Sequence, residues 1–373
     1  MNLATSCLQH VQATTGRVQA SPGAVQTLDP LQDGRWQHFA RGHSRATLFH
    51  SRAWLEALSR TYDYRPVVFT TAGPSQELEN GAVFCAVESW LTGRRLVCLP
   101  FSDYCDPLAS DQDESAALIS AIIERESRHK KWRYIEMRLS QALAIAGAGP
   151  RQGRIHTLHR LDLTPSLEEI FQNFHKSSTQ RKVRRAEREK LEYREGGMEY
   201  FEDFYRLFTS ARKRHGRPPQ PPAWFRNLAE SFGGDFKIRL SCRDGRAVAT
   251  LLTLRHKDAM TYKYGGSDPQ FNPLGSMHLL FWKAIQEAKM LGLRCFDFGR
   301  SEAEHTGLIT FKRRWGATES VLRYLRYGDP SNVEDVFEPS AESWKSVAAS
   351  SVFSLLPLRI LPFAGRLLYK HVG

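Results

Sequence analysis

The 373-residue sequence carries 52 lysines and arginines against 40 aspartates and glutamates, a formal net charge of +12. This length is about two to three times the usual size of a domain, so it predicts two domains. Hydrophobic residues make up 41% of the chain and charged residues 25%, which excludes a disordered, collagen-like or coiled-coil protein. The basic balance favours an anionic partner: nucleic acid, a phosphorylated small molecule or an anionic membrane surface.

The six cysteines contain no C-x-x-C pair, and most of them lie inside apolar, strand-like runs. This placement predicts reduced, buried thiols rather than a metal centre or disulfides. The chain shows no basic start followed by an apolar segment, and no run approaches the ~18 apolar residues of a membrane span. We therefore expect a cytoplasmic protein whose residues 1–26, poor in large apolar side chains, form a loose leader.

Two stretches of the chain show the same order of elements. In 27–156 we expect a helix at 51–60, strands at 67–71, 81–91 and 94–101, a helix at 114–129 and a strand at 134–139. In 157–328 we expect helices at 200–215 and 223–232, strands at 236–242, 247–255 and 260–265, a helix at 276–291, a strand at 294–298, a helix at 305–315 and a strand at 321–327. The shared order predicts an α/β protein of two tandem domains with mixed α+β sheets, joined by a loop within 140–165.

The densest positive charge lies at 176–217, where thirteen lysines and arginines face seven acidic residues. Within this stretch, hydroxyl residues precede an expected helix that carries Arg184, Arg185 and Arg188. Several guanidinium groups together bind phosphate oxygens well, so this helix is a candidate phosphate-docking surface. The alternative is a solvated helix face.

Two further segments place polar residues beside expected strand ends. Tyr264 lies in an expected strand, and Ser276 begins the following helix after a Gly- and Pro-rich loop. The free backbone N–H groups at this helix start could bind an anion, or the loop could be an ordinary connection between strand and helix. Asp297 ends an apolar strand, the position at which α/β sheets place functional groups. Glu302 and His305 are spaced to share a metal ion, but the pattern offers no third ligand, so no metal is expected.

Several of these motifs together resemble the FemAB-like branch of the GNAT acyltransferase superfamily. The motifs are Leu99–Tyr104, Phe174–Arg188, the Pro-rich run 217–222, Tyr262–Ser267, Asp297–Gly299 and Gly307–Gly316. The resemblance covers about 45–327. It implies tandem GNAT domains that transfer an acyl or aminoacyl group from a thioester or a tRNA ester to the amine of a cell-envelope or polysaccharide precursor.

The resemblance also implies roles for individual residues. Lys312 would stabilise an oxyanion or a phosphate, and Asp297 or His305 would take the proton of the amine. Tyr264 and Arg300 would orient the substrate. The co-substrate would be acyl-CoA or aminoacyl-tRNA, with no bound cofactor, although the loop at 272–277 keeps one glycine of the CoA-binding pattern.

Two other functions stay open at this point. The basic stretch 176–217 would also suit a nucleic-acid-binding protein, and a duplicated GNAT-like fold could be an inactive scaffold. The tail at 329–373 has an apolar helical face at 344–355 and, from residue 344 onward, four lysines and arginines without an acidic residue. We expect this amphipathic tail either to contact an anionic inner membrane surface, near a lipid-linked acceptor, or to pack onto the second domain. No stable protein partner is expected.

Overall fold

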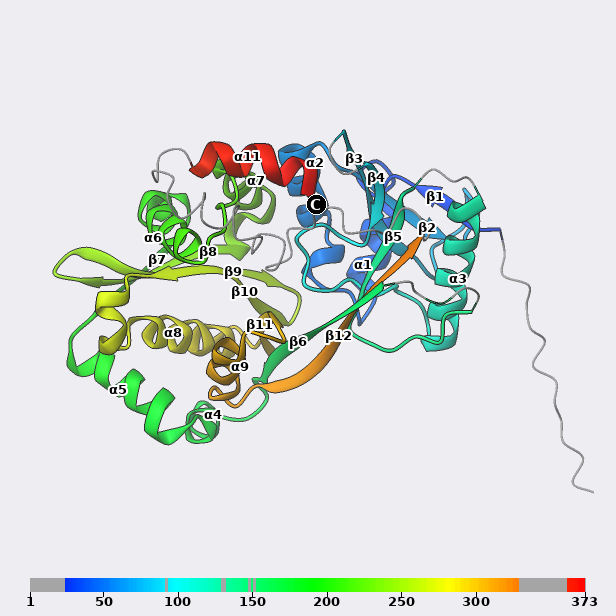
Figure 1. Ribbon diagram of the computed structural model, residues 1–373. Helices are drawn as coiled ribbons and strands as arrows, with labels where there is room; N and C mark the ends of the chain where they lie inside the picture. The colour runs from blue at the N-terminus through cyan, green and yellow to red at the C-terminus, as the bar shows by residue number, and fades with distance from the viewer. Residues whose placement is uncertain are drawn as a thin grey trace, which may run out of the picture.

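Twelve strands form a continuous sheet in the order β1-β2-β3-β4-β5-β12-β6-β11-β10-β9-β8-β7 (Figure 1). The structure, a computed structural model, describes residues 24–90, 93–128, 132–146, 149, 152–328 and 361–372. The edge strands are β1 (Gln26–Leu28) and β7 (Glu192–Gly196). The order of the strands in the sheet differs from their order in the chain, and β12 and β6 at the centre of the sheet are the strands out of sequence.

Four strands of each half follow the same pairing pattern. They are β2 (Arg65–Thr70), β3 (Ala82–Ser89), β4 (Gly93–Val97) and β5 (Tyr134–Leu139), and β8 (Phe236–Arg243), β9 (Arg246–His256), β10 (Ala259–Ser267) and β11 (Cys295–Glu302). In each set the first two pairs are antiparallel and the third is parallel. A parallel pair needs a crossover, which α3 (Gln112–Arg128) and α8 (Ser276–Met290) provide. The predicted mixed α/β fold with two similar tandem halves is confirmed.

The strand that follows each set pairs with the other half. β6 (Gln152–Asp162) follows β5 in the chain but pairs with β11, whereas β12 (Thr318–Gly328) follows β11 but pairs with β5. β6 and β12 also pair with each other and so join the two halves into one sheet. The expected boundary between 156 and 157 falls inside β6, and the expected second domain includes β12. The domain bounds therefore stay a prediction.

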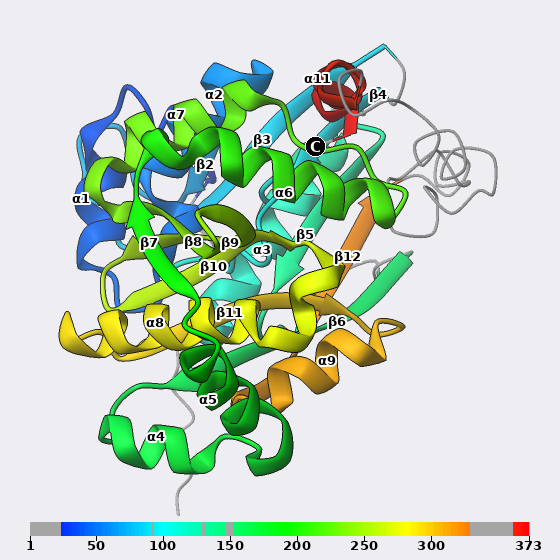
Figure 2. The same cartoon turned by 90° about the vertical axis from the view of Figure 1, so that its left-hand side faces the viewer.

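Helices cover both faces of the sheet in the second half. α6 (Phe201–Arg214) contacts β9 and β10 on one face, and α8 contacts the same strands on the other (Figures 1 and 2). α7 (Pro222–Phe232) packs against α2 (Arg52–Tyr62) of the first half. The remaining described helices include α1 (Gly34–Gly42), α4 (Leu167–Asn173), α5 (Arg181–Arg188), α9 (Thr306–Arg313) and α11 (Leu361–Val372).

Aromatic side chains fill the core between the halves. Trp54 on α2 and Trp224 on α7 are fully buried, and their rings meet edge to face at 5.2 Å between centroids. A second core cluster, around Phe281 of α8, lies between that helix and β11. Aromatic pairs of this geometry stabilise a core beyond the area that they bury. The halves therefore pack together through a shared apolar interface.

Some expectations differ from the structure. The strand expected at 94–101 ends at Val97, because the chain leaves the sheet through Pro100 and a left-handed residue, Phe101, with φ of +60°. β6 lies inside the expected loop region. The expected apolar face at 344–355 and most of the leader lie outside the described residues.

The cysteines that the structure describes agree with the expected thiol state. Four of them are buried and one is partly buried, and all five are free: Cys85, Cys98, Cys105, Cys242 and Cys295. Cys7 lies outside the described residues.

Candidate active site

The main chain of β11 is irregular where it meets the first half. Its parallel pairing with β10 ends where Thr261 faces Asp297. Beyond this point its pairing with β6 shifts between Asp297 and Arg300, and Gly299, which lies between them, has φ of +69°. A Cβ atom at Gly299 would lie 3.2 Å from Oδ2 of Asp103. Glycine therefore permits both the left-handed backbone and the close approach of that carboxylate.

The loop at 98–104 brings the Asp103 carboxylate from the first half to β10 and β11. Lys263 donates a hydrogen bond to Asp103 at 3.0 Å, and Arg300 Nε lies 3.9 Å from the same carboxylate. The Lys263 ammonium also lies 4.8 Å from the centre of the Phe49 ring, so the first half encloses it. Burial alone would raise the pKa of Asp103, but Lys263 and Arg300 outweigh burial and lower it. Asp103 is thus a buried, ionised anchor for two cations.

Asp297 connects the same loop to the bulge of β11. Its Oδ2 accepts a hydrogen bond from the Tyr104 hydroxyl at 3.2 Å, and its Oδ1 accepts one from the Gly299 N–H at 2.7 Å. Burial raises the pKa of Asp297, Arg160 at 3.5 Å opposes the rise, and the charge of Asp103 adds to it. Both oxygens are in contact with protein groups, which favours a positioning role for this carboxylate.

Lys312 reaches the bulge of β11 from α9. Its ammonium group donates hydrogen bonds to the carbonyl oxygens of Gly299 at 2.7 Å and Arg300 at 2.9 Å. The residue is only 2% exposed, and burial lowers the pKa of Lys312 from 10.5 to about 8. An ammonium group has three N–H donors, so two hydrogen bonds leave one donor for a reacting group. The expected stabiliser of an oxyanion thus lies at the irregular part of the sheet.

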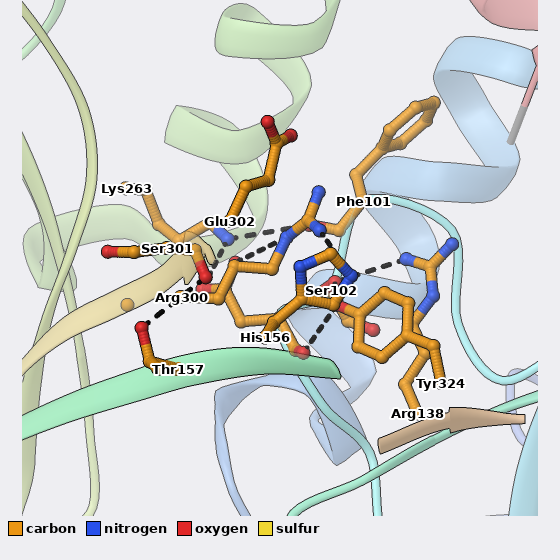
Figure 3. A network of polar contacts seen from close by, with 12 residues as sticks. Phe101, Ser102, Arg138, His156, Thr157, Lys263, Arg300, Ser301, Glu302 and Tyr324 are labelled. Carbon is orange, nitrogen blue, oxygen red and sulfur yellow. Dashed lines mark hydrogen bonds and ion pairs between the residues drawn. The ribbon is translucent and has the colours of Figure 1, made fainter. Parts of the chain in front are cut away.

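The exchanged strands supply a polar wall beside Arg300 (Figure 3). Arg300 donates to Nε2 of His156 on β6 at 3.5 Å, and its guanidinium lies 5.3 Å from the ring centre of Tyr324 on β12. The Tyr324 hydroxyl donates to the Asp103 carbonyl at 2.6 Å. Burial, with a further contribution from Arg300, lowers the pKa of His156 to about 3, so this imidazole is neutral. Arg300 therefore contacts groups of both halves.

Two residues expected at the site lie apart from this cluster in the contacts described. His305 pairs with Glu302 at 3.5 Å, and Glu302 also accepts a hydrogen bond from Arg217. Tyr264 accepts a hydrogen bond from Trp224 Nε1 at 2.8 Å inside the aromatic core, and burial raises the pKa of its hydroxyl. The structure thus groups Asp297, Arg300 and Lys312 but does not bring His305 or Tyr264 into contact with them.

Ser276 lies at the start of α8, where α5 covers the helix end. A Cβ atom at Gly275 would lie 2.3 Å from the carbonyl oxygen of Lys182, so the backbones of the two segments touch. Ser276 is fully buried, and its hydroxyl has no hydrogen-bond partner among the described residues. The free helix N-terminus that would bind an anion is therefore closed by protein at this point.

The basic side chains of α5 face outward. Arg184, Arg185 and Arg188 are exposed, whereas Val183 and Ala186 are buried toward α8. α8 lies between α5 and the sheet (Figure 1), so the three arginines are on the outer side of the second half. They do not contact the Asp297 and Lys312 cluster in the interactions described.

Several residues of the candidate site were not predicted from the sequence. The sequence did contain a signal for Asp103, Tyr104 and Lys263, because they lie in Leu99–Tyr104 and Tyr262–Ser267, two of the runs that carry the family resemblance. No local pattern singles out the charged residues of β6 or Tyr324, because only the strand exchange brings them to the site. The residues that the sequence did not indicate as site residues are Asp103, Tyr104, His156, Arg160, Lys263 and Tyr324.

The described ranges contain no group of three or more His, Cys, Asp or Glu side chains placed to hold a metal ion. In the same ranges no helix has the length and apolar character that crossing a membrane requires.

Residues 174–313 match the acetyltransferase (GNAT) domain family, and this segment contains Lys312, Asp297 and the bulge of β11. Over 158 residues the chain is 27% identical to a UDP-N-acetylmuramoylpentapeptide-lysine N(6)-alanyltransferase of Weissella viridescens. The alignment covers 41% of this chain and 46% of that enzyme, so the chain spans about half the length of this curated relative.

Two solved structures share the fold. FemX covers 80% of this chain and 97% of its own, with a TM-score of 0.62 and 14% identity. A conserved protein of unknown function from Bacteroides thetaiotaomicron covers 81% of this chain and 99% of its own, with a TM-score of 0.50 and 13% identity. The matched segment is thus similar to a GNAT domain, and the chain shares its fold with FemX. The resemblance to the FemAB-like branch that the sequence indicated is confirmed.

Proposed function

We propose that this protein is an N-acyltransferase that moves an aminoacyl group from a tRNA ester to the amine of a cell-envelope or polysaccharide precursor. The observation that carries the proposal is the buried ammonium of Lys312, fixed by two carbonyl groups with one N–H donor remaining. Attack of the amine on the ester carbonyl forms a C–N bond and an oxyanion. The C–O bond then breaks, and the proton of the amine passes to the leaving alkoxide oxygen, which becomes a hydroxyl group of the tRNA.

In this proposal the charged residues have different tasks. Lys312 stabilises the oxyanion, because a preorganised donor in a water-poor site stabilises developing charge strongly. Asp297 keeps the bulge of β11 in place and remains the candidate proton acceptor. Arg300, held between Asp103 and His156, orients the substrate. Lys263 and Asp103 connect the two halves around the reacting groups.

Two observations favour a tRNA ester over acyl-CoA as donor. The start of α8 is covered by α5, because the Lys182 carbonyl approaches Gly275 closely and Ser276 is fully buried, so a pyrophosphate has little access to this helix end. The exposed arginines of α5 suit a polyanion, because each phosphate contact with an arginine releases counterions. The named activity of the Weissella relative, an alanyl transfer to lysine N6, supports an aminoacyl group and an amine acceptor.

A transfer assay with the full chain tests the proposal. Labelled alanyl-tRNA and labelled acetyl-CoA are each offered with amine-bearing envelope precursors, including UDP-N-acetylmuramoylpentapeptide. Label should move from the tRNA ester and not from CoA, and Lys312→Met should reduce the transfer by ~10²-fold or more. Transfer from CoA alone would contradict the donor. Binding of tRNA without any transfer would favour a nucleic-acid-binding protein, and the absence of both would favour an inactive scaffold.

A further inference from the structure

α11 is fixed to the molecule along one face. Leu361, Gly365 and Tyr369 are buried and recur every fourth residue, which places them on one side of the helix. A Cβ atom at Gly365 would lie 2.0 Å from the carbonyl oxygen of Pro219, so the helix touches that backbone directly. Tyr64 donates to the Tyr369 carbonyl at 2.6 Å. This anchoring determines which side chains of α11 face outward.

The opposite face of α11 presents an aromatic ring and a cation. Phe363 is 71% exposed, and Lys370 is exposed seven residues later, which puts both at nearly the same angle around the helix. The sequence of α11 contains Arg366 and Lys370 but no aspartate or glutamate. An exposed aromatic ring on the same helix face as an exposed lysine is an arrangement that suits a membrane interface.

Trp90 is a second exposed aromatic ring, at the other end of the helix. It lies directly after β3, is 83% exposed, and its ring meets the His371 ring at 5.5 Å between centroids. His371 is held in turn, because Ser89 contacts its Nδ1 at 3.0 Å and Arg95 donates to its carbonyl at 2.7 Å. Trp90 and Phe363 are therefore exposed at the two ends of one anchored helix.

We propose that Trp90, Phe363 and Lys370, the α11 surface, bind the headgroup region of an anionic phospholipid bilayer. Indole and phenyl rings enter the interface between headgroups and acyl chains, and lysine ammonium groups pair with lipid phosphates. A bilayer suits these residues because the two rings are separated and Lys370 supplies a cation, whereas a stable protein interface buries a large continuous area. The acidic Glu88 near this face is within 3.9 Å of Arg94, which offsets its charge.

The surface lies apart from the proposed transfer reaction, so binding and catalysis are tested separately. The full-length protein is sedimented with vesicles of phosphatidylglycerol and phosphatidylcholine, and with vesicles of phosphatidylcholine alone. We expect strong binding only to the anionic vesicles. The double variant Trp90→Ser/Phe363→Ser should bind them at least ~10-fold more weakly, because two apolar side chains no longer enter the interface.

A matched control distinguishes binding through the α11 surface from nonspecific adsorption to vesicles. Met290→Ser removes a side chain that is 76% exposed at the end of α8, and it should leave vesicle binding unchanged. Lys370→Glu should weaken binding, and added salt should reduce that difference. Equal loss in the control and the double variant would overturn the proposal. So would binding to neutral vesicles as tight as to anionic ones, or dimers in light scattering that the double variant abolishes.

Discussion

The hydroxyl group of Tyr104 donates a hydrogen bond to Oδ2 of Asp297 at 3.2 Å, and this contact joins a loop of the first half to the bulged strand of the second. The other carboxylate oxygen of Asp297 accepts the N–H of Gly299. One buried side chain thus fixes both the loop and the bulge. The candidate site is complete only when the two halves are packed together.

Removing this hydroxyl should weaken the packing of the halves. Tyr104→Phe leaves the buried Asp297 without one donor, so the free energy of unfolding should fall by about 1–3 kcal/mol. Chemical denaturation measures it. Tyr262→Phe is the control, because Tyr262 is also substantially buried but its hydroxyl makes no described hydrogen bond. A double-mutant cycle with Asp297→Asn should give a coupling energy between the two side chains. If the two changes in unfolding free energy simply add, the contact does not contribute to stability.

Lys312→Met should reduce the transfer rate by ~10²-fold or more, the usual loss when one oxyanion donor is removed. Initial rates with labelled donor measure this loss, and thermal denaturation checks that the fold survives. Lys283→Met on α8 serves as a control for the loss of one lysine from the same half. A wild-type rate in Lys312→Met would exclude this ammonium from the mechanism.

The lowered pKa of Lys312 predicts a pH dependence of stability. The folded protein releases this proton near pH 8, whereas the unfolded chain keeps it up to about pH 10.5. Between these values the unfolded state binds more protons, so this group makes stability rise with pH. Lys312→Met should remove that part of the slope in denaturation curves measured across this window. An identical slope in both proteins would contradict the shift.

Asp103 should make the protein sensitive to acid. Its pKa is lowered in the folded state, so its stabilising effect is present above the unfolded value of about 3.9 and is lost as the pH falls toward the folded value. Asp103→Asn also leaves Lys263 buried without its counter-charge, so it should destabilise the protein at neutral pH by about 3 kcal/mol. Urea denaturation should show this difference shrinking in acid, and a constant difference would contradict the assignment.

The exposed arginines of α5 should bind the polyanionic donor. Changing Arg184, Arg185 and Arg188 to Gln should raise KM for aminoacyl-tRNA and flatten its dependence on salt, because fewer phosphate contacts release counterions. The control variant changes Arg41, Arg65 and Arg226, three exposed arginines outside α5, to Gln. If both triple variants show the same KM, the basic helix is only a solvated face.

The sequence predicts the helices and strands that bury an apolar face. It does not predict the elements whose side chains contact the other half of the protein. The helix at 276–291 and the strands at 236–242, 247–255 and 260–265 are confirmed to within about two residues, because apolar periodicity directly reflects burial. β6 was not predictable in this way, since His156 and Arg160 interrupt its apolar pattern and face the site. Asp103 has no local signature, because its partners Lys263 and Arg300 lie more than a hundred residues away.

The exchange of β6 and β12 has a consequence for how the chain acquires its structure during synthesis. β5 ends at Leu139, but its neighbour β12 begins at Thr318. At 5–20 residues per second, the ribosome needs about 10–40 s to make the intervening segment. Throughout that time the newly made first half presents an unpaired β5 edge, the kind of edge that recruits strands from other chains. Chaperone protection of this nascent edge would therefore raise the yield of native protein, and a truncation before β12 should aggregate.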